Sequence, residues 1–211
     1  MTILTSDSGD GGAADTSIAG RTLDKALGGS GSLSWADTGD NIKTNGSNGF
    51  TASGDAASAL VSMGASINAK ARIAFTMSAA CNLCVIGRKA DASAAMDDAA
   101  LLAILAGTTS LRIREYTSGT DHQNLTISAI STGTQYWLEL EVNGTTITAR
   151  VLTAALAVRN SVSHTLASPP AGFYWGFGYF FGGVTATLDS FVIEDVAAAA
   201  AGGRQRGSKC H

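Results

Sequence analysis

The segment YWLELEVNGTTITARV, residues 136–151, constrains the fold of this chain more than any other feature. Apolar and polar residues alternate on both sides of Asn143-Gly144, and Asn-Gly is preferred in the two-residue type I′ turn of a β-hairpin. We therefore predict an antiparallel hairpin. Pairing outward from the turn places Val142 opposite Thr145, Leu140 opposite Ile147, Leu138 opposite Ala149 and Tyr136 opposite Val151.

The second face of this hairpin is polar. The same pairing places Glu141 opposite Thr146, Glu139 opposite Thr148, and Trp137 opposite Arg150. A cation–π contact between Trp137 and Arg150 would contribute about 0.5–1 kcal/mol at an exposed position. We expect Glu139 and Glu141 to lie on a solvated sheet face beside Thr146, Thr148, Arg112 and Arg150.

Similar alternation recurs from Phe50 to about Val196, with glycine, Asn or Asp between the runs. One face carries Ala71, Ile73, Phe75 and Met77, and elsewhere Leu111 and Ile113 oppose Arg112 and Arg114. The exception is DASAAMDDAALLAILAG, where one or two helical turns are expected before a strand. These patterns predict an all-β protein, an antiparallel β-sandwich over residues 16–196, with an N-terminal arm (1–15) and an Ala/Gly-rich C-terminal tail (197–211).

Composition excludes several classes of protein. The 211 residues include 25 glycines and two prolines, which is typical of a globular chain with many tight turns. A net charge of -3 gives no electrostatic reason to expect nucleic acid. No run approaches the roughly 20 apolar residues of a membrane helix, and the N-terminus lacks the features of a signal peptide. We expect a protein made in a cytoplasm, without a membrane partner.

The sequence offers few candidate metal ligands. A three-residue spacing in a strand directs Cys81 and Cys84 to opposite faces, so buried free thiols are expected. The histidines and Cys210 lack zinc-ligand spacing. Carboxylates at Asp7, Asp10, Asp15 and Asp189 are candidate Ca²⁺ ligands, but their spacing differs from the regular calcium loop. No other cofactor is expected.

Three segments together resemble the concanavalin A-like lectin/glucanase superfamily, the laminin-G-like jelly rolls. They are the lead-in from Ala19-Gly-Arg-Thr-Leu-Asp to Trp35, the hairpin described above, and the closing LDSFVIED. Leu23 stands where the family's lead-in has proline. The resemblance spans roughly residues 15–196 and implies a jelly roll, of a kind used in bacteriophage particles and in glycan-binding proteins.

Glycanases of this superfamily carry carboxylates two or more positions apart on one strand, one acting as nucleophile and another as acid. Glu139 and Glu141 have that spacing. Val142 and Asn143 follow where the family has a further carboxylate, and no aromatic residue lines the strand beyond Trp137. We therefore expect no catalytic residues and no enzymatic activity.

Seven of the chain's 14 aromatic residues lie between Phe173 and Phe181. In a strand, Phe173, Trp175, Phe177, Tyr179 and Phe181 share one face, which is expected to be core. Tyr174 and Phe180 lie on the other face. With Trp137 and Arg150, they are the candidate carbohydrate-binding or partner-binding residues.

Two functions follow as expectations. The first is a non-enzymatic structural component of a virus particle, such as a phage capsid decoration, fibre or tail protein. Its partners would be other virion subunits and copies of itself, and these would hold the two terminal arms. The alternative is a carbohydrate-binding module or host-receptor-binding protein with a glycan as ligand.

Overall fold

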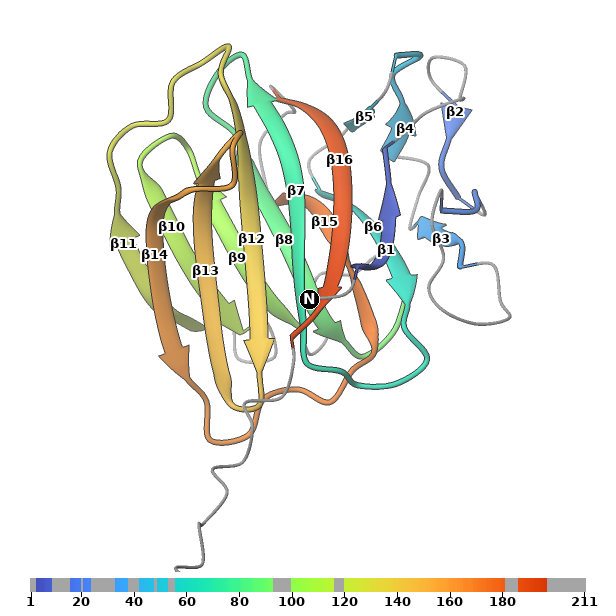
Figure 1. The fold of residues 1–211 in the computed structure, drawn as a ribbon, viewed down its shortest axis with the longest axis vertical. Coiled ribbons are helices and arrows are strands. Elements are labelled where there is room, and N and C mark those ends of the chain that lie inside the picture. The colour runs from blue at the N-terminus through green and yellow to red at the C-terminus, as the bar shows by residue number, and fades with distance from the viewer. Residues whose placement is uncertain are drawn as a thin grey trace, which may run out of the picture.

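A computed structural model of the chain describes residues 3–8, 16–19, 21–23, 33–37, 42–47, 49–52, 56–92, 100–115, 120–180 and 186–196 (Figure 1). These residues form strands and no helix, and so they include no helix able to cross a membrane. The strands make two antiparallel sheets packed face to face. The predicted all-β sandwich is confirmed.

The nine-stranded sheet lies at the front of Figure 1. Its strand order is β14-β13-β12-β7-β16-β5-β4-β2, and β1 also pairs with β16. The central position of β7, between β12 and β16, brings together segments far apart in the sequence. The strands are β1 (Ile3–Asp7), β2 (Thr16–Ser17), β4 (Ile42–Thr44), β5 (Phe50–Ala52), β7 (Ala69–Met77), β12 (Gln135–Asn143), β13 (Thr146–Thr153), β14 (Val158–Thr165) and β16 (Ala186–Asp195).

The seven-stranded sheet lies behind it, in the order β11-β10-β9-β8-β15-β6-β3. The strands are β3 (Trp35–Asp37), β6 (Ala56–Ser62), β8 (Asn82–Lys89), β9 (Leu101–Ala106), β10 (Ser110–Glu115), β11 (Thr120–Thr126) and β15 (Tyr174–Phe180).

The main core lies between the sheets, where alternate residues of each strand turn inward. Trp35, Phe50, Phe177 and Phe191 form its aromatic centre, with ring centroids 5.3–6.3 Å apart. Burying each such side chain contributes about 1.5–3 kcal/mol. The predicted inward faces of β7, β10 and β15 are confirmed, since Ile73, Phe75, Ile113, Trp175 and Tyr179 are buried.

The hairpin forms, but its predicted register was wrong by two residues. Val142 pairs with Ile147, Leu140 with Ala149, Leu138 with Val151 and Tyr136 with Thr153. The central turn residues are Gly144 and Thr145. Of these two, Gly144 alone has a positive φ (60°), whereas a type I′ turn needs two. A shift of two preserves the face of every side chain, so the predicted apolar face remains buried.

Residues 3–7, within the predicted N-terminal arm, form β1 and pair with β16 of the same chain. Residues 93–99, where helical turns were expected, lie outside the described residues, as does the tail 197–211. The strand expected after them is β9.

Both described cysteines are free and buried, as predicted. Cys81 packs in the core between the sheets, whereas Cys84 packs in a second apolar cluster on the outer side of the seven-stranded sheet. Their side chains therefore lie on opposite faces.

Candidate ligand-binding face

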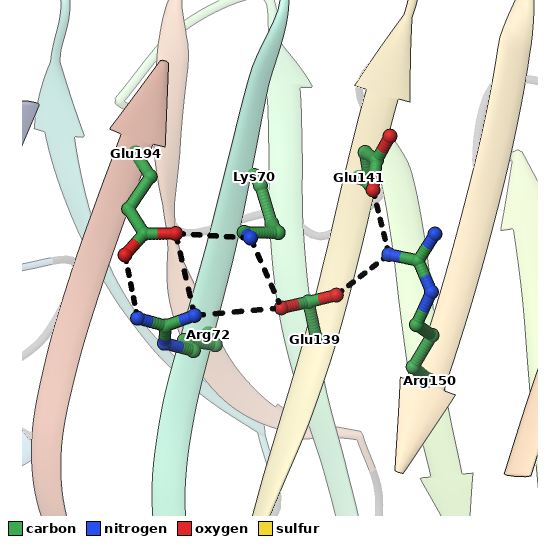
Figure 2. Close-up of polar contacts among 6 residues, drawn as sticks. All are labelled: Lys70, Arg72, Glu139, Glu141, Arg150 and Glu194. Atoms are coloured by element: carbon green, nitrogen blue, oxygen red, sulfur yellow. Dashed lines mark hydrogen bonds and ion pairs between the residues drawn. The ribbon is translucent and has the colours of Figure 1, made fainter. Parts of the chain in front are cut away.

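The outer face of the nine-stranded sheet concentrates charge on four adjacent strands. In the register, Glu139 of β12 lies between Arg72 of β7 and Arg150 of β13, while Lys70 lies between Glu141 and Glu194. We call the whole set the ionic network (Figure 2). It consists of Lys70, Arg72, Glu139, Glu141, Arg150 and Glu194.

Ion pairs connect the network across the strands. Arg72 donates to both carboxylate oxygens of Glu194, with Nη2 2.6 Å from Oε1 and Nη1 3.3 Å from Oε2. The Lys70 ammonium lies 3.0 Å from Glu194 and 3.9 Å from Glu139. On the other side, Nη1 of Arg150 donates to both Glu139 and Glu141, at 2.6 Å each.

Burial reduces the solvent screening of these pairs, and it also penalises each charge. The Glu139 side chain is only 4% exposed, and three cations lie within 4 Å of it. Burial raises the pKa of Glu194, but the hydrogen bond from Lys70 and the charge of Arg72 outweigh that effect, so the pKa lies below its ordinary value. Burial lowers the pKa of Arg150, and its bonds to Glu141 and Glu139 reverse this into a net rise.

The network lines a shallow depression of about 550 Å³. Leu152, Leu156 and Val158 complete its wall on the β13–β14 side. In the row next to the charges, half-buried Trp137 pairs with Leu152 across the strands, and the Arg72 guanidinium carbon lies 5.4 Å from the centre of the Trp137 ring. The face therefore has an aromatic and aliphatic strip beside a strip of hydrogen-bonding groups.

The structure brings two of the four sequence-predicted site residues onto this face and separates the others. Trp137 and Arg150 share it, but they are not cross-strand partners, because Trp137 faces Leu152 and Arg150 faces Glu139. The cation over Trp137 is Arg72. Tyr174 lies in the other sheet, half-buried against the outer apolar cluster. The side chain of Phe180 is outside the described part.

The expectation of a solvated glutamate pair beside Arg112 was wrong. Arg112 belongs to β10 of the other sheet, where it bonds Asp121, and Glu139 is buried. Pairing with β7 covers Glu139 from the side that the hairpin alone leaves open.

Two of the predicted calcium ligands, Asp7 and Asp189, lie among the described residues, and both accept hydrogen bonds from protein groups. Both carboxylate oxygens of Asp7 accept hydrogen bonds, one from Arg21 and one from the Trp35 indole. Asp189 accepts a bond from Gln135. Asp10 and Asp15 lie outside the described residues, among which no three His, Cys, Asp or Glu side chains gather to hold a metal.

Sequence reasoning missed Lys70, Arg72 and Glu194 as members of the network. Alternation placed Lys70 and Arg72 on the side of their strand opposite the apolar face, so their outward direction could be inferred from the sequence. Their neighbours could not be inferred, because the pairing of β7 with β12 and β16 joins residues up to 126 positions apart.

Comparison with known proteins supports the fold. No family model matches the chain, and no curated protein matches it. Among solved structures, the metal-free exoplasmic/lumenal domain of VIP36 has a TM-score of 0.58 at 10% identity, covering 91% of this chain and 92% of that one. Lectin II from Ulex europaeus has a TM-score of 0.58 at 9% identity, with 83% and 97% covered.

A protein of unknown function, SO2946 from Shewanella oneidensis MR-1, has a TM-score of 0.54 at 17% identity, covering 79% of this chain and 80% of that one. At these identities the likeness concerns architecture alone. The chain has the concanavalin A-like jelly-roll fold that its sequence resembles.

Proposed function

We propose that the chain is a non-catalytic carbohydrate-binding module whose ligand lies in the depression on the outer face of the nine-stranded sheet. The observation that carries this proposal is the apolar strip beside the ionic network: Leu152 lines the depression, and Trp137 is its cross-strand neighbour. A sugar ring has an apolar C–H face and a rim of hydroxyls. An aromatic residue next to fixed donors and acceptors matches both parts.

The geometry favours binding over hydrolysis. A glycosidase needs one carboxyl group free to protonate the leaving group and another free to act as nucleophile or base. Here Glu139 and Glu141 accept hydrogen bonds from the same nitrogen of Arg150. Because both carboxylates already bond one guanidinium, we propose that their role is structural and in ligand binding.

Proteins of this fold offer a precedent for glycan ligands. The VIP36 domain, which has a TM-score of 0.56, is known in a Ca²⁺/Man3GlcNAc-bound form and in a Ca²⁺/Man-bound form. The proposal for this chain includes no Ca²⁺, since no three metal-ligating side chains gather among the residues that the structure describes. A role in a virus particle remains a prediction from the sequence, testable by whether deleting residues 198–211 impairs incorporation.

Binding to a panel of mannan, laminarin, dextran and xylan, measured by affinity electrophoresis and calorimetry, tests the proposal. We expect wild type to bind at least one polymer, and Arg150→Ala and Glu141→Gln to weaken that binding. Matched controls lie in the other sheet: Arg114, with a side chain 22% exposed against 23% for Arg150, and Glu115, at 21% like Glu141.

Arg114→Ala and Glu115→Gln should bind as wild type does. Thermal unfolding of each variant identifies any loss that comes from misfolding. Equal weakening by the control variants would place the ligand elsewhere, and binding by none of the four polymers would contradict the proposal for this panel.

A further inference from the structure

The charges that line the depression cancel. Lys70, Arg72 and Arg150 are matched by three carboxylates, and each of the six groups belongs to at least one ion pair. An anionic ligand would gain no net attraction from this face, and it would compete with Glu139, Glu141 or Glu194 for their cations.

The network also keeps hydrogen-bonding groups available. Arg150 uses Nη1 for both of its ion pairs, and Glu141 uses only Oε2. Among the described residues, Nη2 of Arg150 and Oε1 of Glu141 have no protein partner. The Arg150 Nη2 donor and the Glu141 Oε1 acceptor therefore lie close together on two side chains that already bond each other. Hydroxyl groups both donate and accept, so neighbouring hydroxyls match this arrangement.

Leu156 supplies independent evidence at the edge of the depression. Its φ is 63°, in the left-handed region, which costs a non-glycine residue about 1–2 kcal/mol. The residue is nevertheless 44% exposed, and the nearby Val158 is 61% exposed. Glycine at position 156 would relieve the strain. Strained residues of this kind cluster at ligand sites.

We propose that the depression takes a neutral sugar, with its hydroxyls bonded to Arg150 and Glu141 and its apolar side against the aliphatic wall of Leu152, Leu156 and Val158. This inference rests on the proposed function and adds the class of glycan. The balanced charge gives uronic and sulfated sugars no net attraction to the depression. In this proposal Leu156 contacts the ligand at the expense of stability.

The first test compares the neutral panel above with polygalacturonate, alginate and heparin, each at about 50 and 500 mM salt. We expect binding to a neutral polymer that changes less than about twofold with salt, and no binding to the anionic polymers. Salt-sensitive binding to the anionic polymers alone would overturn this inference while leaving carbohydrate binding in place. Binding to neither class would contradict both proposals.

The second test is Leu156→Gly. The variant should unfold at an equal or higher temperature than wild type and bind the neutral polymer about tenfold more weakly, the loss expected when an apolar contact near 1.4 kcal/mol is removed. Ile3→Ala, which removes an exposed aliphatic side chain outside the depression, should bind normally.

Unchanged affinity in Leu156→Gly would overturn the role of this rim. Sedimentation of the same proteins tests whether this face instead contacts a second copy of the chain. A wild-type dimer that dissociates in Leu156→Gly, together with no glycan binding, would show such a contact and would contradict the neutral-sugar site.

Discussion

The two sheets present different outer faces, although their inner faces are alike. On the seven-stranded sheet the outer side carries apolar residues, including Leu60, Cys84, Ile86 and Leu102, and these are fully buried. On the nine-stranded sheet the outer side carries the ionic network and an open depression. A sandwich needs only its inner faces to fold. The first outer face therefore extends the core, whereas the second leaves a depression in which we propose a ligand lies.

The two outer faces should differ most in the unfolding free energy lost when one carboxylate is neutralised on each sheet. Glu139→Gln should lower the free energy of unfolding by about 3–5 kcal/mol, because three cations lose a buried partner. Asp121→Asn, which weakens the bonds to Arg112 and Arg114 at a carboxylate 29% exposed, should cost about 1 kcal/mol or less. Urea unfolding measures both. Similar losses would mean that the ionic network is an ordinary surface feature.

Truncating an apolar residue should cost more stability on the outer face of the seven-stranded sheet than on that of the nine-stranded sheet. Leu102→Ala on the outer side of the seven-stranded sheet should cost about 2–5 kcal/mol, as much as Leu140→Ala between the sheets. Val158→Ala on the other outer face should stay within about 0.5 kcal/mol. A small effect of Leu102→Ala in the same unfolding experiment would show that the outer cluster is not part of the core.

Lowering the pH should reduce the contribution that Glu194 makes to the stability of the folded chain. Since its folded-state pKa is lowered, its contribution to stability is present above the ordinary glutamate pKa and is lost as the pH falls through the folded value. The difference in unfolding free energy between wild type and Glu194→Gln should therefore be largest near neutral pH and shrink below about pH 4. A difference that grows on acidification would reverse the assigned direction.

The reactivity of the Cys84 thiol shows how well the apolar outer face of the seven-stranded sheet is covered. Of the experiments proposed here, it should give the smallest effect. Burial raises the pKa of the Cys84 thiol far above its ordinary value. In a Cys210→Ser background, neither Cys81 nor Cys84 should react with a thiol reagent until the protein unfolds. Rapid labelling of Cys84 alone would show that the outer face opens while the core stays closed.

Sequence alternation predicted the faces of the strands but not their neighbours. The side of Leu140 or Glu139 follows from a period of two, which survives the two-residue error in hairpin register. The partners of Glu139 depend on strand order, and nothing local in the sequence places β7 beside β12. Leu156 escaped notice for a related reason, since its left-handed conformation arises in a hairpin loop without the glycine or asparagine that normally signals one.

The indole N–H resonances of the three tryptophans test the central claim most directly. Trp35 and Trp175 are fully buried in the core, while Trp137 is half-buried on the proposed binding face. Trp137→Phe assigns the third peak. On titration with oligosaccharides from the neutral polymer that binds best, we expect the Trp137 indole signal to shift with saturation while the other two stay fixed. A saturable interaction that leaves the Trp137 signal unmoved would contradict a sugar site on this face.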